Sequence, residues 1–147
     1  MIRPIKHYDE ARVRHIYYHC HPMWPEPREH EFFCYPTLVY IANYEIVGYT
    51  SFSISELHGL KTLVGHDVGV HPDFTGLGYG SKLHDARVAY GVGVGCRRFI
   101  GMTWDANKAM TQIFIKSGYH ACEIAQGAYP NNTPPCDGVI WVGNLGG

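Results

Sequence analysis

Three closely spaced glycines, between an apolar run and an expected helix, are the residues whose type and spacing best suit chemistry. They are Gly76, Gly78 and Gly80, within the stretch VGVHPDFTGLGYGSKL at 68–83. The first turn of a helix leaves backbone N–H groups without partners, and the helix dipole adds partial positive charge there. Glycines let a phosphate approach those N–H groups without meeting a Cβ. The stretch predicts a phosphate-binding turn or a purely structural turn, and the glycines alone do not decide between them.

Two familiar phosphate-binding templates do not fit this stretch. A P-loop needs lysine directly after its last glycine, whereas Gly80 is followed by Ser81 and then Lys82. The dinucleotide fingerprint needs a tight turn after a strand of a parallel sheet. Here a predicted hairpin precedes the strand, and residues 71–75 make a long connection. Asp105 could imitate the ribose-binding acid, but the context disfavours a dinucleotide site.

A third template fits, because the stretch closely resembles the acyl-CoA loop of the GNAT acetyltransferase superfamily. That loop reads Val-x-Pro, a short spacer, then Arg/Gln-x-x-Gly-x-Gly/Ala and a helix. The matching residues are Val70, Pro72, Gly76, Gly78 and Gly80. A second segment, NKAMTQIFIKSGY at 107–119, is similar to the family's asparagine, apolar helical face and Lys-x-Gly-Phe/Tyr. Two motifs at the right separation are more specific than either alone.

The resemblance implies a fold, a co-substrate and its binding residues. The implied fold is α/β (α+β), a single domain over 1–147 with a mixed, mostly antiparallel central sheet flanked by helices and splayed at the acyl-CoA site. The implied co-substrate is acetyl-CoA. Its pantetheine arm would lie along the backbone of Val68, Gly69 and Val70. Its remaining contacts would come from Thr75, Gly76, Leu77, Gly78, Tyr79, Gly80, Ser81, Asn107 and Phe114.

Two residues depart from the family pattern. Thr75 stands where arginine or glutamine is usual, and binding should survive because backbone amides make the main phosphate contacts. Phe114 stands at the usual general-acid position, where many members carry a tyrosine that protonates the departing thiolate. A phenyl ring cannot act as an acid. Three alternatives remain: water protonates the thiolate, another hydroxyl group of the protein does so, or catalysis has been lost.

The proton of the attacking amine also needs an acceptor. His66 and Asp67 lie in the part of the strand where family members often place an acidic residue, and both are candidate bases. His66 has the more suitable intrinsic pKa. A histidine hydrogen-bonded within the sheet, an aspartate paired with a neighbouring loop or arginine, and a water acting as base are the alternatives.

The stretch HIYYHCHPMW at 15–24 invites two interpretations. His15 and His19 lie four residues apart, a spacing that zinc sites use, but no second tightly spaced ligand pair accompanies them, so no metal is expected. The region also joins the first predicted helix to a proline-rich loop, which in this fold commonly shapes the acceptor site. The residues predicted to form an aromatic wall there are Tyr17, Tyr18, His21 and Trp24, with ordinary packing as the rival interpretation.

The elements that must position these residues follow from periodicity and turn signals. Strands are expected at 1–5, with Pro4 indicating an edge, and at 37–42, 46–55, 62–70, 97–104, 119–125 and 138–143. Helices are expected at 9–20, capped by Asp9, and at 107–117, closed by Gly118. Between them, an apolar helical stripe is formed by Tyr79, Leu83, Ala86 and Tyr90. Residues 21–27 should form a loop, and 43–45 a short hairpin connection.

Composition narrows the function class. The net charge of −1 over 147 residues gives no basic footprint for nucleic acid or an anionic membrane. Five irregularly spaced cysteines, and first residues without a signal-peptide pattern, indicate free thiols and a cytoplasmic setting. The expected partner is a small-molecule amine or a peptide acceptor, with a homodimer left open.

Together, motifs and resemblance predict an N-acetyltransferase that moves an acetyl group from acetyl-CoA to a primary amine by direct attack in a ternary complex. The alternative is a CoA-binding protein of the same fold without transferase activity, a regulatory or sensor module.

Overall fold

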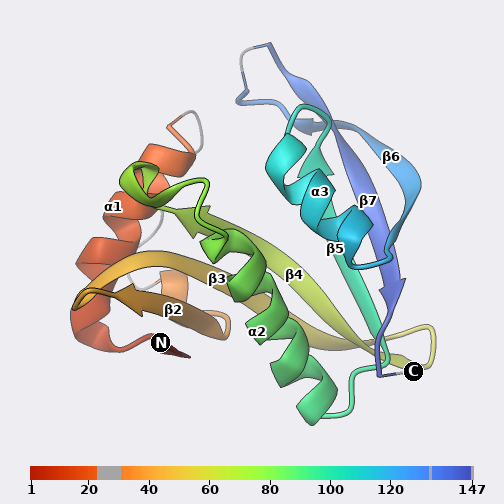
Figure 1. Ribbon diagram of the computed structural model, residues 1–147. Helices are drawn as coiled ribbons and strands as arrows, with labels where there is room; N and C mark the ends of the chain where they lie inside the picture. Colours follow the sequence, from red (N-terminus) through yellow and green to blue (C-terminus); the bar gives the residue numbers. More distant parts are fainter. Residues whose placement is uncertain (23–30, 133, 147) are drawn as a thin grey trace. The chain divides into compact units, whose positions relative to one another are not determined.

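The chain folds into two compact units, each built from two separate segments. The computed structural model describes residues 1–22, 31–132 and 134–146. Unit 1 comprises Met1–Ser53 and His66–Arg87, and unit 2 comprises Ile54–Gly65 and Val88–Gly147. Within the described ranges, hydrogen-bonded strands follow the order β1-β2-β3-β4-β5-β7-β6 (Figure 1). The predicted mixed, mostly antiparallel sheet with flanking helices is confirmed.

The strands of unit 1 follow the predicted pattern. β1 (Ile2–Pro4) pairs antiparallel with β2 (Thr37–Ala42), which pairs antiparallel with β3 (Glu45–Leu57). Asn43 and Tyr44 form the β2–β3 turn at φ 52° and 66°, as a tight hairpin requires. β1 has no strand on its other side in that order, so the edge position indicated by Pro4 is confirmed. β3 leads through a short turn into β4 (Leu60–Val70).

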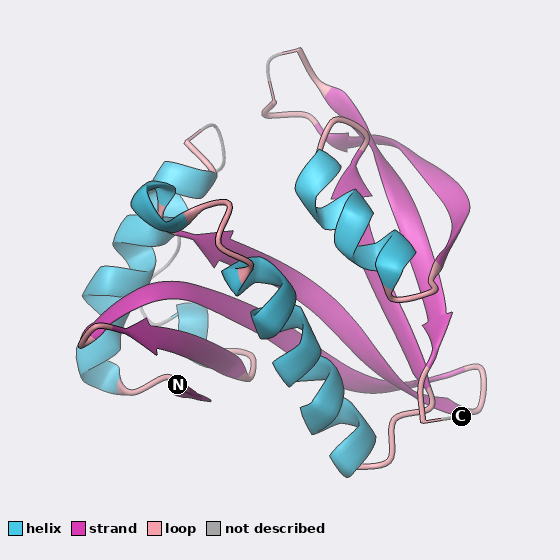
Figure 2. Ribbon diagram, in the orientation of Figure 1, coloured by secondary structure: helices cyan, strands magenta, loops and turns pink. Residues whose placement is uncertain are grey.

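Two helices cover opposite faces of the unit 1 strands. Val13 and Ile16 of α1 (Glu10–Cys20) pack in a buried cluster with Tyr49 of β3. A Cβ built on neighbouring Gly48 would instead meet Leu83 of α2 (Tyr79–Gly93) at 2.9 Å. Because successive strand residues point to opposite faces, α1 and α2 lie on opposite sides (Figure 2). Three short 3₁₀ helices complete the unit: η1 (His7–Asp9), η2 (Glu31–Phe33) and η3 (Pro72–Phe74).

The buried face of α2 is not the predicted one. Tyr90, expected on the apolar stripe, is 46% exposed. Leu83 is buried as expected, but the residues buried beside it are His84 and Arg87. The Arg87 Nε donates to His84 Nδ1 at 3.0 Å, so the two polar side chains enter the interior as a hydrogen-bonded pair. A count of apolar residues alone could not detect this face.

Unit 2 contains the strands β5, β6 and β7 and the helix α3. β7 (Cys136–Asn144) pairs antiparallel with both β5 (Arg98–Trp104) and β6 (His120–Tyr129). α3 (Lys108–Lys116) is capped by Asn107, whose Oδ1 accepts the Met110 N–H at 3.2 Å. Gly118 ends the helix at φ +81°, as predicted.

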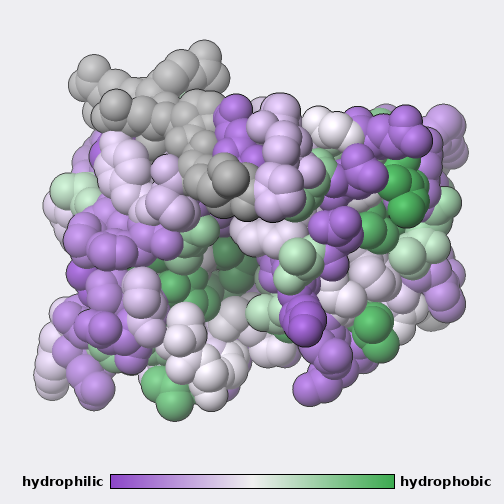
Figure 3. Space-filling view, turned by 90° about the horizontal axis from the view of Figure 1, so that it is seen from above, coloured by the Kyte–Doolittle hydropathy of each residue, from purple (hydrophilic) through white to green (hydrophobic). Residues whose placement is uncertain are grey.

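The outer surface carries both hydrophilic and hydrophobic side chains. Hydrophilic residues cover most of the face in Figure 3, with hydrophobic ones interspersed. Among the described residues, no helix is both long and apolar enough to cross a membrane. All five cysteines are free.

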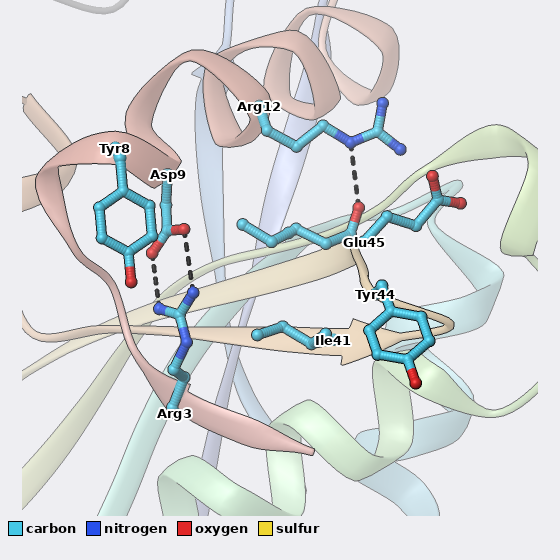
Figure 4. A pocket seen from close by; sticks show the side chains of 8 residues that line it. Arg3, Tyr8, Asp9, Arg12, Ile41, Tyr44 and Glu45 are labelled. Atoms are coloured by element: carbon cyan, nitrogen blue, oxygen red, sulfur yellow. Dashed lines mark hydrogen bonds and ion pairs between the residues drawn. The ribbon is translucent and has the colours of Figure 1, made fainter.

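Asp9 occupies the N-cap position of α1, as predicted. Contrary to the prediction, however, its side chain makes no capping hydrogen bond to the helix. Its carboxylate accepts from Arg3 Nη1 at 2.6 Å, from Arg3 Nη2 at 3.0 Å and from the Lys6 N–H at 2.7 Å. The Arg3 bonds, drawn in Figure 4, tie β1 to the start of α1. Arg3 is the main cause of the lowered pKa of Asp9.

Asp9→Asn should lower the free energy of unfolding at pH 7 by about 2 kcal/mol, since it removes charge-assisted hydrogen bonds at a side chain only 3% exposed. A carboxyl group with a lowered folded-state pKa stabilises the fold above its unfolded pKa, and that contribution is lost as pH falls through the folded pKa. Urea denaturation of both proteins at pH 7 and pH 3 measures the difference, which should shrink in acid.

The control for this substitution is Asp73→Asn, because the Asp73 side chain is 81% exposed. It should change the free energy of unfolding by less than about 0.5 kcal/mol. Equal effects of the two substitutions would contradict a stabilising role for the Arg3–Asp9 pair.

Candidate functional site

The C-terminal half of β4 extends beyond its pairing with β5. The parallel pairs join Thr62 to Arg98, Leu63 to Phe99 and Val64 to Ile100. β4 then continues to Val70. Within the described part of the chain, no strand pairs with residues 65–70 on the edge that β5 occupies earlier. The backbone of Val68, Gly69 and Val70 therefore has the extended form that an added, strand-like ligand segment needs.

The glycine turn after β4 is open, and its conformation requires glycine. η3 follows His71, and the chain then turns at Gly76 and Gly78, with φ of +77° and +84°, before α2 begins at Tyr79. A Cβ at either glycine would meet nothing within 4 Å. The Gly78 carbonyl accepts the Lys82 N–H at 3.1 Å, which makes it the first acceptor of the α2 ladder. An anion can thus reach the first-turn N–H groups of α2.

A lysine and two tyrosines lie beside this turn. The Tyr79 ring is 4.7 Å from the Tyr40 ring, and the Lys82 Nζ is 5.9 Å and 6.0 Å from the two ring centroids. The ammonium of Lys82 therefore adds positive charge near the start of α2. A P-loop has its lysine directly after the final glycine, whereas Lys82 lies in the second turn of α2.

Asp67 is the centre of a buried hydrogen-bond network in unit 1. The Tyr49 hydroxyl donates to its Oδ2 at 2.5 Å, and His21 Nε2 is 2.9 Å from its Oδ1. The Asp67 pKa lies below its ordinary value: burial alone would raise it, but the hydrogen bonds from His21 and Tyr49 and the charges of His21 and Arg87 outweigh burial. Burial and the Asp67 charge raise the pKa of Tyr49 well above its ordinary range. Asp67 is therefore ionised near neutral pH, and Tyr49 is the neutral donor.

His66 lies beside this network and is better suited than Asp67 to accept a proton. Burial, followed by the charge of Arg87, lowers the pKa of His66, so its imidazole is neutral near pH 7. Its Nε2 lies 2.9 Å from the Ser53 hydroxyl oxygen. Its ring stacks on Tyr35 at 4.3 Å between centroids. A carboxylate with a lowered pKa is a weak base, whereas a neutral imidazole is a competent one.

These side chains border a small cavity, which we name the aromatic pocket, with a volume of about 150 Å³. The described residues that line it are Tyr17, Phe32, Tyr35, Thr37, Ser51, His66 and Asp67. The Thr37 hydroxyl lies 2.8 Å from the Phe32 carbonyl oxygen and 3.1 Å from that of Tyr35, so it fixes the segment that carries both rings. The two candidate bases and one residue of the predicted acceptor wall thus share one cavity.

The other residues predicted for the acceptor wall are placed differently. His21 contacts Asp67, and its ring lies 5.1 Å from Tyr17. Tyr18 is partly exposed beside Tyr17 and is not among the described residues of the aromatic pocket. Trp24, and most of the loop predicted at 21–27, lie outside the described residues.

The two predicted site residues of the second motif have clear local environments in unit 2. Asn107 caps α3 through its side chain. Phe114 is 2% exposed and packs against Phe99 and Trp141, at 5.3 Å and 5.8 Å between ring centroids. The roles of both toward acetyl-CoA stay predictions.

Sequence reasoning missed Tyr49 and the pairing of His21 with Asp67. The one available signal was Gly69, a glycine inside a strand, which often marks a close approach of another group. A Cβ at Gly69 would clash with the Tyr49 ring, so this glycine makes room for the ring that reaches Asp67.

The histidines at the end of α1 lie close to His71. The rings of His15, His19 and His71 lie 4.5–5.8 Å apart. Among the residues that the structure describes, no three His, Cys, Asp or Glu side chains are arranged to hold a metal ion.

A larger hollow of about 430 Å³ lies at the other end of α1 (Figure 4). Its buried carboxylate, Asp9, is bound by Arg3, and its Arg12 Nε donates to the Ile46 carbonyl at 3.0 Å. Tyr44 stands at its rim with a fully exposed side chain. The described residues that line this hollow include Glu45 but no histidine.

Comparisons with known proteins agree with this geometry. Residues 10–119 match the model of the acetyltransferase (GNAT) family. No curated protein matches the sequence. A ribosomal-protein-alanine N-acetyltransferase from Brucella melitensis superimposes with a TM-score of 0.82 at 17% identity, covering 99% of both chains. Arabidopsis thaliana NAA60 in complex with acetyl-CoA gives 0.82 at 18% identity, covering 100% of this chain and 99% of that one.

An N-acetyltransferase from Staphylococcus aureus Mu50 gives a TM-score of 0.82 at 16% identity, covering 99% of this chain and 98% of that one. Likeness at such identities establishes the fold, and the family model extends over three quarters of the sequence. The chain belongs to the acetyltransferase (GNAT) family.

Proposed function

We propose that the protein transfers the acetyl group of acetyl-CoA to a primary amine by direct attack in a ternary complex. The observation that carries this proposal is the open glycine turn at the N-terminus of α2, directly after the unpaired edge of β4. The solved structure of NAA60 with acetyl-CoA supports the choice of co-substrate by analogy of fold.

Different residues of unit 1 would bind different parts of acetyl-CoA. The backbone amides from Thr75 to Ser81 would hold the pyrophosphate, with Gly76 and Gly78 keeping its approach free of side chains. The extended backbone of Val68–Val70 would pair with the pantetheine arm. One of its N–H groups would donate to the thioester oxygen, where negative charge develops during attack.

The experiment has two stages. Thermal melts with and without excess acetyl-CoA should show a rise in melting temperature, because a ligand that binds only the folded state stabilises it by mass action. Thiol release from acetyl-CoA is then followed with a panel of primary amines. Acetyl-CoA-dependent release that requires an amine supports transfer. The absence of both a melting shift and calorimetric binding would refute the proposal.

Phe114 motivates the second candidate, a CoA-binding protein without transferase activity. No acidic hydrogen is available from its phenyl ring to protonate a departing thiolate. Binding of acetyl-CoA with no thiol release for any amine in the panel would favour this candidate.

Phe114→Tyr tests the role of this position directly. The added hydroxyl should raise turnover by about tenfold or less, since general-acid assistance matters little for a good leaving group such as a thiolate. Turnover of both proteins with the best acceptor, across a pH range, is the measurement. The ring tip abuts Gly101, where a Cβ would lie 3.2 Å from Phe114 Cζ, so melting temperature is recorded in parallel.

A large loss of turnover at unchanged acetyl-CoA affinity and melting temperature would contradict the assignment of Phe114 to the general-acid position.

A further inference from the structure

The aromatic pocket contains a carboxylate that is held in place by hydrogen bonds. Asp67 is 19% exposed, and both of its carboxylate oxygens are fixed by neighbours, Oδ2 by the Tyr49 hydroxyl and Oδ1 by His21. These bonds favour the ionised form over the protonated one. Because Tyr49 is held in its neutral state, it supplies a hydrogen bond without adding charge.

Aromatic rings surround the same space. Tyr17 and Phe32 meet edge to face, at 5.8 Å between centroids and 70° between planes. Tyr35 stacks on His66 with 26° between the ring planes, and the Thr37 hydroxyl holds the segment that carries Phe32 and Tyr35. The faces of such rings are electronegative and attract cations, most strongly where water is displaced. A fixed carboxylate beside three rings is a recognised environment for an ammonium group.

The size and position of the pocket restrict what enters it. A volume of about 150 Å³ accommodates a group of only a few non-hydrogen atoms. The pocket reaches β4 at His66 and Asp67, directly before Val68–Val70, the backbone proposed above for the thioester. A nitrogen held at Asp67 therefore lies within a few strand positions of that segment, at about 3.3 Å per residue.

From these observations we infer that the aromatic pocket selects a small, unbranched alkylammonium acceptor, with Asp67 as its counter-charge and Tyr17, Phe32 and Tyr35 around its chain. This inference rests on the proposed function, and it assigns Asp67 to recognition rather than to proton abstraction. An acceptor with a carboxylate near its amine is disfavoured, because that charge would enter the pocket against Asp67.

The chemical step follows from the two neighbouring side chains. When His66 Nε2–H donates to the Ser53 hydroxyl, Nδ1 keeps its lone pair and takes one proton from the alkylammonium. The neutral amine attacks the carbonyl carbon of the thioester, the C–N bond forms and the C–S bond breaks. The sulfur leaves with the bonding pair, and the thiolate takes the second proton lost by nitrogen. The products are the N-alkylacetamide, CoA thiol and protonated His66.

The first test is binding. Calorimetry with CoA-saturated protein compares n-propylammonium with two probes: 1-propanol, its uncharged isostere, and β-alanine, in which a carboxylate replaces the terminal methyl group. We expect n-propylammonium to bind and the other two to bind at least about 30-fold more weakly, since each leaves a buried charge unpaired or repelled. Equal binding of all three, or preference for β-alanine, would overturn the inference.

The second test is substitution. Asp67→Asn keeps the shape of the side chain and removes its charge, so it should weaken n-propylammonium binding by about 30-fold or more and abolish discrimination against 1-propanol. Tyr35→Leu removes one ring and should cost about threefold to tenfold in affinity. The matched control is Glu45→Gln, which removes one negative charge from the hollow of Figure 4 and should leave binding unchanged.

The failures are distinguishable. If acetyl-CoA raises the melting temperature and amines are acetylated, but Asp67→Asn and Glu45→Gln bind n-propylammonium alike, the inference falls and the proposed function stands. If Asp67→Asn unfolds, Tyr35→Leu and the three-probe comparison decide: a loss of about threefold to tenfold in n-propylammonium affinity with Tyr35→Leu supports the pocket, and unchanged affinity refutes it.

Discussion

Gly78→Val should weaken the binding of acetyl-CoA by at least about 30-fold and remove the thermal stabilisation by this ligand. Gly78 has φ +84°, a conformation that a β-branched residue adopts only at a cost of about 1–3 kcal/mol. Relief of that strain moves the amides that open α2, and the new side chain occupies the open space through which phosphate would approach. Calorimetric titration of both proteins with acetyl-CoA is the measurement.

Gly59→Val is the matched control for backbone strain. Gly59 has φ +77°, and a Cβ there also meets nothing within 4 Å, but the residue lies in the β3–β4 turn. Both variants should lose similar free energy of unfolding, and only Gly78→Val should lose affinity for acetyl-CoA. If both variants bind the ligand as the parent does, the glycine turn is structural and the proposed phosphate site is wrong.

His84 should make the protein markedly less stable in mild acid. Burial, followed by the charge of Arg87, lowers the pKa of His84 to about 3. Below the unfolded-state value of about 6.5, the unfolded chain binds a proton that the folded chain does not, so the free energy of unfolding falls as pH falls. The slope is about 1.4 kcal/mol per pH unit, which amounts to about 2 kcal/mol between pH 8 and pH 5.

His84→Asn tests this contribution. The amide oxygen can still accept from Arg87 Nε, and the side chain no longer titrates. Urea denaturation at pH 5, 6, 7 and 8 should show a shallower decline for the variant, whatever its stability at pH 8. Parallel curves for the two proteins would show that His84 does not set the acid sensitivity.

Local features of the fold were predictable because local sequence determines them. The Asn43–Tyr44 turn, the Asn107 cap and the Gly118 end of α3 each depend on residues within a few positions of one another. The glycine turn was predictable for the same reason, since Gly76 and Gly78 set its backbone conformation directly. These features, together with the second motif at 107–119, were sufficient to predict the family.

The acceptor side was only partly predictable, because it is assembled from distant segments. Asp67 pairs with His21, 46 positions earlier, and with Tyr49, 18 positions earlier. Neither spacing carries a periodic signal. His84 and Arg87 were missed for another reason: two polar groups can be buried when they bond to one another, and hydropathy patterns count them as exposed.

The division into two units has a consequence for dissecting the protein by genetic means. The chain passes between the units after Ser53, after Gly65 and after Arg87, and these points fall inside β3, β4 and α2 respectively. No single cut liberates either unit, and every crossing severs a regular element rather than a linker. Neither half can be transplanted into a relative as a cassette, so recombination between homologues should yield folded chimaeras only when their junctions lie in the turns, such as 43–44 or 58–59.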